Sequence, residues 1–485
     1  MATSDPTDDH SSRPPLGGDL TVRTFRSALG GIAVVALAVR VAFVLIRQSS
    51  VVLVTGDAYW YHFQARLVAD GRGFLDPFSY FKDGVSAPGA DHPPGFVLVL
   101  AALDRLGISS PQGQRLVMCL VGTASVVLVG YLGRRLAGPW VGLVAAGIAA
   151  LYPNFWINDG MLMVETIYIL ASVVALVACY RYLDRPRWGE VALMSAALTA
   201  GAMVRPEALL LFGLMVLPVV LWRRSLRWPV RLGQLALAAA IPVLAFAPWA
   251  AYNQARFGQF VPVSTGAGQT LAAANCDLTY GGDFLGYYST KCLLPPEITP
   301  PTATNRAARD RQYNEKATAY MREHAGELPK VVAARVARLW HLYRPGQSIG
   351  LDGFVEGRSG GPPGTGFVAV REALWSYYVL APLALVGLWV LHRRRRIVYP
   401  LLAQPVLATL VAAMTFGITR YRAGAEITLA VGAAVAVVAG VAWLAGRGSP
   451  PTGDRTGPPD RTAGEGTAAD RTADAGTEPV AGPVS

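Results

Sequence analysis

The apolar run ALGGIAVVALAVRVAFVLI (residues 28–46) and the polar stretch TGDAYWYH (residues 55–62) set the pattern of this chain. An apolar run of about 20 residues spans a bilayer as a helix. Asp57 follows this run among aromatic side chains of the kind that lie at the membrane interface. A carboxylate at that depth is costly unless it is solvated or functional. Two interpretations therefore stay open, a solvated loop aspartate and a functional acid.

The composition identifies an integral membrane protein. Of the 485 residues, 52% are hydrophobic and only 15% are charged, whereas soluble domains contain about 25% charged residues. The net charge is +11, but the basic residues form short clusters between apolar runs, as in proteins that use them to fix their membrane orientation. Because no basic stripe with interleaved aromatic residues is present, nucleic acid is not an expected partner.

Ten apolar segments are candidate membrane spans. Clusters of Lys and Arg follow alternate segments on the side shared with Arg23 and Arg26, which favours ten helices with both chain ends in the cytoplasm. The shorter run 94–107 would reverse this alternation if it crossed the membrane, so we expect a juxtamembrane helix at the outer surface. The expected spans are 28–46, 112–132, 139–157, 161–182, 188–204, 206–222, 232–252, 372–391, 397–418 and 426–444.

These spans predict an all-α polytopic membrane protein with a helical first outer loop and a large exported loop of mixed structure between helices seven and eight. Within that loop, residues 306–343 read as one or two amphipathic helices, broken near Gly326 to Pro329. The expected parts are a disordered cytoplasmic N-terminus (1–27), a seven-helix module (28–252) with its outer loop (48–111), the exported loop (253–371), three helices (372–445) and a disordered cytoplasmic tail (446–485).

Two cysteines, Cys276 and Cys292, lie close together in the exported loop. In an oxidising compartment this proximity favours a disulfide. Free thiols and metal-binding thiols are the alternatives.

Ionisable residues from distant parts of the chain fall at the same expected membrane depth, and several interrupt apolar segments. Such residues are functional candidates, although a structural ion pair is the alternative for Glu165 and Arg205. Arginine binds phosphate with a planar fork, and a carboxylate can act as a general base. The group comprises Asp57, His62, Asp91, His92, Asp159, Glu165, Arg205, Glu207, Arg420 and Arg422.

Other features limit the chemistry. Pro93 and Pro94 push His92 toward an extended conformation that would aim its side chain, although the start of a helix explains them as well. One of Arg420 and Arg422 could be a membrane anchor instead of a phosphate ligand. The six histidines include no His-x-x-x-His pair, and no phosphate-binding Walker loop or Gly-x-Ser-x-Gly motif is present.

Together, the motifs Asp57-Ala58-Tyr59-Trp60-Tyr61, His92-Pro93-Pro94 and Arg420-Tyr421-Arg422, with seven helices before a large exported loop, resemble the GT-C superfamily of polytopic glycosyltransferases. The resemblance is to the branch of protein O-mannosyltransferases and the aminoarabinose transferase that modifies lipid A. Two positions depart from that pattern. Many members have a second acid where this chain has Ala58, and His92 stands in place of a lysine, which leaves its charge at neutral pH open.

The resemblance implies an inverting glycosyltransferase on the outer face of a bacterial cytoplasmic membrane. Its donor would be a sugar on a polyprenyl phosphate, and its acceptor a lipid, glycan or protein. Asp57 would be the catalytic base, and no cofactor is indicated, although a divalent metal stays open. The donor phosphate would bind His92, Arg205, Arg420 and Arg422, while Tyr59, His62, Asp91, Glu165 and Glu207 would contact or orient the sugar and acceptor.

Two other function classes stay open from the sequence. A transporter or flippase of lipid-linked sugars would place its charged groups near the middle of the membrane and show broken helices in an inverted repeat. A non-catalytic envelope-assembly protein would depend on its exported loop but not on Asp57.

Overall fold

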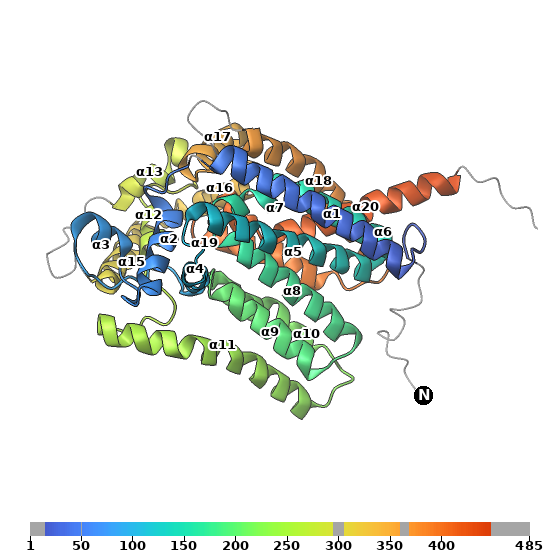
Figure 1. Ribbon diagram of the computed structural model, residues 1–485, viewed down its shortest axis with the longest axis horizontal. Coiled ribbons are helices and arrows are strands. Elements are labelled where there is room, and N and C mark those ends of the chain that lie inside the picture. Colours follow the sequence, from blue (N-terminus) through green and yellow to red (C-terminus); the bar gives the residue numbers. More distant parts are fainter. Residues whose placement is uncertain (1–14, 50, 294–304, 359–367, 448–485) are drawn as a thin grey trace, which may run out of the picture. The chain divides into compact units, whose positions relative to one another are not determined.

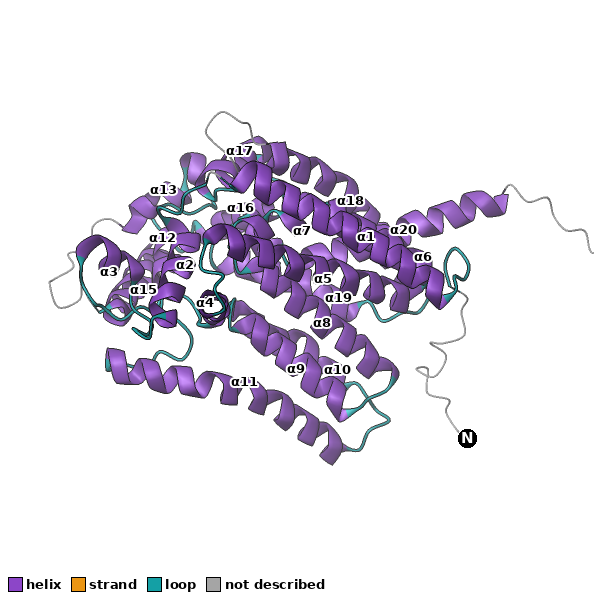
Figure 2. Ribbon diagram, in the orientation of Figure 1, coloured by secondary structure: helices purple, strands orange, loops and turns teal. Residues whose placement is uncertain are grey.

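The computed structural model describes residues 15–49, 51–293, 305–358 and 368–447. Within these ranges it contains helices and loops and no β-strand (Figure 2). The expected all-helical fold class is therefore confirmed. The expected disordered ends fall largely on residues 1–14 and 448–485, which lie outside the described ranges. The compact unit is Met1–Trp443, and of the second unit, which begins at Leu444, only the end of the last helix is described.

In the described part of the chain, six helices are long and apolar enough to cross a membrane, and a bent pair makes a seventh candidate. The bent pair joins α6 (Pro139–Leu151) to the segment Pro153–Gly160, which contains α7 (Pro153–Trp156), at an angle of 69°. The six are α1 (Val22–Phe43) with its π-helical end to Gln48, α5 (Pro111–Ala137), α8 (Glu165–Asp184), α11 (Trp228–Phe257), α18 (Val368–Arg393) and α20 (Ala425–Arg447) (Figure 1).

The three remaining expected spans are also helical, but their helices are shorter than any of those six. They are α9 (Trp188–Ala202), the composite segment Pro206–Leu221 that ends in α10 (Leu217–Leu221), and α19 (Tyr399–Met414). All ten segments singled out by hydropathy thus form helices in this chain, while the number that crosses the membrane stays a prediction.

The first loop is helical, as the sequence predicts. It contains α2 (Gly56–Ala69), α3 (Pro77–Asp83) and α4 (Gly95–Arg105). The last of these has 11 residues, too few to span a bilayer. The N–H of Gly95 donates to the carbonyl of Met203 at 2.9 Å, and a Cβ at Gly95 would lie 2.7 Å from that oxygen. The absence of a side chain at Gly95 therefore lets the start of α4 meet the end of α9.

The long polar segment, residues 253–371, is built from short helices in its described part, without the strands that a mixed structure would include. Its two longer helices are α15 (Arg306–Glu323) and α16 (Leu328–Leu339), so residues 306–343, which were expected to form one or two helices, form two here. The shorter ones are α12 (Ala267–Ala274), α13 (Asp277–Tyr280), α17 (Pro345–Gly350) and the π-helical turn Leu351–Val355.

Two buried arginines of α16 hold this polar segment together. Arg335 donates to the carbonyls of Ala274 and Ala413, at 2.7 Å and 3.2 Å. Arg338 donates to the carbonyl of Leu285 at 2.6 Å. These bonds satisfy buried carbonyls that would otherwise be costly, and they attach the polar segment to the end of α19.

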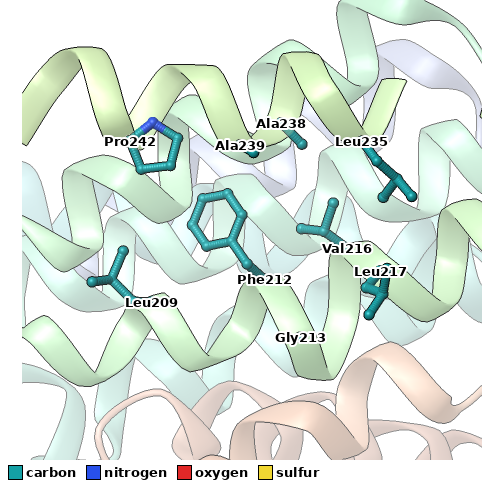
Figure 3. Close-up of a pocket in the computed structure, with 9 residues that line it drawn as sticks. All are labelled: Leu209, Phe212, Gly213, Val216, Leu217, Leu235, Ala238, Ala239 and Pro242. Atoms are coloured by element: carbon teal, nitrogen blue, oxygen red, sulfur yellow. The ribbon is translucent and has the colours of Figure 1, made fainter. Parts of the chain in front are cut away.

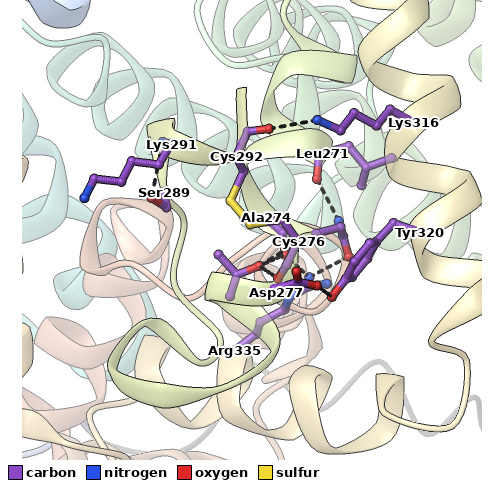
Figure 4. The surroundings of a disulfide bond; sticks show 12 residues. Leu271, Ala274, Cys276, Asp277, Ser289, Lys291, Cys292, Lys316, Tyr320 and Arg335 are labelled. Carbon is purple, nitrogen blue, oxygen red and sulfur yellow. Dashed lines mark hydrogen bonds between the residues drawn. A yellow bond between two sulfur atoms is a disulfide. The ribbon is translucent and has the colours of Figure 1, made fainter. Parts of the chain in front are cut away.

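The expected disulfide between Cys276 and Cys292 is present beside these contacts (Figure 4). The two cysteines are separated by 16 positions. Closing a loop of about that length stabilises the folded state by about 3 kcal/mol, because it restricts the unfolded chain.

We therefore expect the double substitution Cys276→Ser with Cys292→Ser to lower the free energy of unfolding of the polar segment by about 3 kcal/mol. Limited proteolysis and thermal unfolding of the detergent-solubilised protein measure this loss. Reductant should destabilise the wild type and leave the double variant unchanged, which serves as the control. A wild-type transition that reductant does not move would contradict the prediction.

Candidate active site

One cluster of charged side chains collects residues from six parts of the chain at the same end of the helices. We call this set the charged cluster. It contains six residues singled out from the sequence and one further acid, Glu356. Its members are Asp57, His92, Glu165, Arg205, Glu207, Glu356 and Arg420.

Asp57 lies in the first turn of α2, directly after Gly56, whose φ of +78° turns the chain into the helix. The helix N-terminus favours a negative charge there. Its Oδ2 accepts from Arg420 at 3.0 Å, and its Oδ1 lies 3.8 Å from Nε2 of His92. At 36% exposure, the Asp57 side chain is the most accessible acid of the charged cluster.

The pKa of Asp57 is below its ordinary value of 3.8. Burial of the carboxyl opposes ionisation, but the nearby positive charge of Arg420, then that of His92, outweighs it. Asp57 is therefore a carboxylate at neutral pH and has one oxygen directed away from its strongest partner. A carboxylate in this state can accept a proton.

Arg420 is the hub of the charged cluster. It lies in the 3₁₀ turn Thr419–Arg422 between α19 and α20. Its three nitrogens each reach a different carboxylate: Nη2 binds Asp57 at 3.0 Å, Nε binds Glu165 at 2.9 Å and Nη1 binds Glu356 at 2.9 Å. A single guanidinium thus joins the first loop, the start of α8 and the polar segment.

Arg205 also binds two carboxylates, and one of them is the Glu165 that Arg420 binds. Its Nη1 donates to Glu165 at 2.8 Å and its Nε to Glu207 at 2.6 Å. The guanidinium also lies 5.1 Å from the ring centre of Tyr421. The structural ion pair considered for Glu165 and Arg205 is therefore present, and it is continuous with Asp57 through Arg420.

His92 lies directly before α4 and faces α2. Its Nδ1 is 3.2 Å from the hydroxyl of Tyr61, and its ring is 27% exposed. The preceding residue, Asp91, points elsewhere: it pairs with Arg306 of α15 and accepts from Thr265 at 3.0 Å. Asp91 therefore fixes the backbone beside His92 instead of meeting Asp57.

Two other candidates from α2 lie outside the charged cluster. His62 is 2% exposed and is hydrogen-bonded to Gln114 of α5 at 2.9 Å. Tyr59 stacks on Phe78 of α3, with ring centres 4.7 Å apart. Neither touches Asp57, because a helix presents positions four apart on one face, and that neighbour of Asp57 is Tyr61.

Arg422 is also directed away from the charged cluster, which corrects the expectation that it binds the donor phosphate. Its side chain is 0% exposed, donates to Glu426 at 2.7 Å and lies 3.9 Å from the ring centre of Tyr377. In a 3₁₀ helix each residue turns by about 120°, so Arg420 and Arg422 cannot share a face. Arg422 instead pairs within the helical packing.

Sequence reasoning did not single out Glu356 and Tyr288, which both lie in the polar segment. Glu356 is 3% exposed, and its Oε1 accepts from the hydroxyl of Tyr288 at 2.6 Å. No hydropathy pattern in the sequence marks either residue.

Tyr61, which contacts His92, could have been found from the sequence. A helix over residues 56–69 places it one turn after Asp57.

An apolar groove begins close to the charged cluster. It is a cavity of about 480 Å³ between the segment Pro206–Leu221 and α11 (Figure 3). Leu209, two positions after Glu207, stands at one end, and the figure shows Phe212 and Val216 facing Pro242 and Ala238 across it. Its residues are Leu209, Phe212, Gly213, Val216, Leu217, Leu235, Ala238, Ala239 and Pro242.

Among the described residues, no three His, Cys, Asp or Glu side chains are grouped to hold a metal ion. The acids of the charged cluster are paired with arginine nitrogens instead.

The geometry of Arg422 predicts a stability defect that a second substitution removes. Arg422→Met leaves the buried Glu426 without its cation, which costs about 3–5 kcal/mol. Adding Glu426→Gln removes the unpaired charge, so the double variant should regain the wild-type unfolding temperature. It should also keep the activity of the charged cluster. If the double variant folds normally but is inactive, the prediction fails and Arg422 is again a candidate ligand of the donor phosphate.

Comparison with known families gives one match. Residues 91–252 match the family model described as dolichyl-phosphate-mannose-protein mannosyltransferase. None of the curated protein sequences is similar enough to this chain to count as a match.

Solved structures show more distant likeness. The oligosaccharyltransferase of Archaeoglobus fulgidus in its apo form is 14% identical, with a TM-score of 0.48 over 86% of this chain and 50% of that one. The chain thus spans about half the length of that enzyme. ArnT from Cupriavidus metallidurans bound to undecaprenyl phosphate is 15% identical, with a TM-score of 0.40 over 86% of this chain and 78% of that one.

The family match begins at Asp91, continues through His92 and Glu165 to Arg205 and Glu207, and ends at Tyr252. It therefore includes four members of the charged cluster and the motif His92-Pro93-Pro94, while the motifs at Asp57 and Arg420 lie outside it. Over this third of the chain, the expected resemblance to the GT-C glycosyltransferases is confirmed.

Proposed function

We propose that this protein is an inverting glycosyltransferase that moves a sugar from a polyprenyl phosphate to an envelope acceptor. The observation that carries the proposal is an ionised, accessible Asp57 beside His92, held by an arginine that also binds Glu165. The family matched over residues 91–252 is named for a lipid-phosphate sugar donor. The proposed site is the outer face of a bacterial cytoplasmic membrane.

In the proposed reaction, an acceptor hydroxyl attacks the anomeric carbon from the side opposite the phosphate. The new bond joins the acceptor oxygen to that carbon, and the proton passes to Oδ1 of Asp57. The bond between the anomeric carbon and the phosphate oxygen breaks, and its electron pair leaves with the polyprenyl phosphate. Attack from the opposite side inverts the configuration of the sugar.

The leaving phosphate needs positive charge nearby. Arg205 and Arg420 already bind carboxylates through two and three nitrogens. His92 has an exposed edge, and its Nε2 lies 3.8 Å from Oδ1 of Asp57, beyond hydrogen-bond distance. We therefore assign the direct phosphate contact to His92, with Arg205 and Arg420 acting through their field.

The isoprenoid chain of the donor fits the apolar groove in this proposal. Leu209 places the mouth of the groove two positions from Glu207, and all of its lining side chains are apolar. A lipid tail entering there would leave its phosphate near the charged cluster. The absence of a required cofactor stays a prediction that a chelator tests.

Asp57→Asn should lower transfer by about 10²- to 10⁴-fold, because the amide cannot accept the proton. Cells that contain wild-type protein, Asp57→Asn protein at equal membrane level, or no protein provide the comparison. Mass spectrometry of polyprenyl-phosphate sugars and envelope glycans measures the result. We expect one glycan to disappear and its lipid donor to accumulate in both the variant and the deletion.

Asp104→Asn is the matched control, because it removes a carboxylate from α4 that belongs to no ion pair of the charged cluster. It should leave the glycan profile unchanged. Normal glycans with Asp57→Asn, together with a deletion phenotype, would refute the transferase proposal and favour the flippase or the envelope-assembly protein.

The pKa of Asp57 also predicts the pH dependence. Because that pKa lies below 3.8, protonation of Asp57 should not reduce kcat/KM until the pH falls to about 4. Arg420→Lys keeps the charge but loses hydrogen bonds that lower this pKa, so the acid limb should move to higher pH. Comparing the two pH profiles cancels the contributions of other groups, and coincident acid limbs would contradict this assignment.

A further inference from the structure

The polar segment reaches Asp57 through a chain of three hydrogen bonds. The Tyr288 hydroxyl donates to Oε1 of Glu356 at 2.6 Å, and Arg420 donates to Oε2 of Glu356 at 2.9 Å. Arg420 then donates to Asp57 at 3.0 Å. Glu356 is 3% exposed, so its charge depends on these two donors for compensation.

Tyr288 is held firmly in place. Its ring stacks on Tyr287 and packs on Phe416, with ring centres 4.7 Å apart in both cases. The N–H of Gly417 donates to the carbonyl of Gly286 at 2.9 Å. The segment that carries Tyr288 is therefore attached to the residues that directly precede Arg420.

The disulfide closes the loop that presents Tyr288. Cys276 and Cys292 bracket it, and Figure 4 shows Arg335 beside the bond, donating to the carbonyl of Ala274. The Tyr288 hydroxyl remains a proton donor at all physiological pH values, because burial and the Glu356 carboxylate raise its pKa.

The balance of charge around Arg420 explains why the hydrogen bond from Tyr288 to Glu356 matters. One guanidinium, that of Arg420, balances three carboxylates through three different nitrogens, so its orientation depends on all three contacts. The hydrogen bond from Tyr288 satisfies part of the charge of Glu356. With Oε1 of Glu356 held by Tyr288, its Oε2 stays aimed at Nη1 of Arg420, and the same guanidinium presents Nη2 to Asp57.

We propose that Tyr288 and Glu356 are positioning residues, through which the polar segment holds the Arg420 guanidinium against the carboxylate of Asp57. This inference rests on the proposed glycosyltransferase function. Tyr288 acts through Glu356, and Glu356 acts through Arg420. Neither residue needs to touch the substrate.

The test is a double-mutant cycle with Tyr288→Phe and Glu356→Gln. The probe is a mannosyl polyprenyl phosphate, the donor class named by the matched family, supplied to membranes of the producing cells with their own acceptors. The full-length protein is used throughout. Each rate is divided by the amount of folded protein, as measured by fluorescence size-exclusion chromatography.

Each single substitution should lower kcat about tenfold or more and change KM for the donor less than twofold, since the base is displaced but the lipid site is intact. The double variant should match Glu356→Gln within twofold, because Tyr288 has no effect once the carboxylate is gone. Independent structural damage would instead multiply the two losses, and that result would overturn the proposal.

Tyr320→Phe is the matched control. It removes another tyrosine hydroxyl of the polar segment that donates to a carboxylate, that of Asp277 at 2.8 Å, away from the charged cluster. It should leave kcat unchanged. A loss equal to that of Tyr288→Phe would mean that any such bond in the polar segment matters, and the proposal would fail.

Asp57→Asn in the same assay separates this inference from the proposed function. If Asp57→Asn still transfers the sugar, the proposed function fails. If Asp57→Asn is inactive while Tyr288→Phe and Glu356→Gln keep kcat within twofold of the wild type, only the positioning inference is overturned.

Discussion

The contact between Arg420 and three carboxylates is the constraint on which the rest of this structure depends. Glu165 and Glu356 are almost completely buried, and removing the cation from a buried carboxylate costs about 3–5 kcal/mol. The positions of three elements therefore depend on one another: the start of α8, the first loop and the polar segment. Each has to deliver its acid to the turn between α19 and α20, and the small backbone contacts at Gly95 and Gly417 permit that approach.

The same network determines what a substrate can meet. Two guanidinium groups face four carboxylates, so the cluster is short of positive charge before His92 is considered. An incoming phosphate would be repelled by the buried acids if it approached the arginines from their side. In the proposed reaction it meets the exposed edge of His92 instead. In that reaction, the carboxylate of Asp57 accepts the proton and the imidazole of His92 meets the anion, with Arg420 bound to Asp57.

Much of this site could be predicted because membrane depth is a one-dimensional quantity. Counting alternating spans placed Asp57, His92, Glu165, Arg205 and Arg420 at one level, and the ion pairs join them there. Depth says nothing about direction around a helix axis. Arg422 and His62 lie at a similar depth but on other faces, where Glu426 and Gln114 receive them. Tyr61, one turn after Asp57, takes the place expected for Tyr59 beside the site.

The polar segment could not be placed in this way, since its short helices have neither a span to fix their depth nor a strong apolar period. Its helix pair and its disulfide followed from local sequence, but the contacts of Tyr288 and Glu356 are long-range and depend on how α16 packs against α19. Buried arginines make that packing specific, because Arg335 and Arg338 bind backbone carbonyls whose positions exist only in the folded segment. The first loop thus supplies Asp57 and the turn between α19 and α20 supplies Arg420. In our proposal, the polar segment supplies the contacts that fix how the two meet.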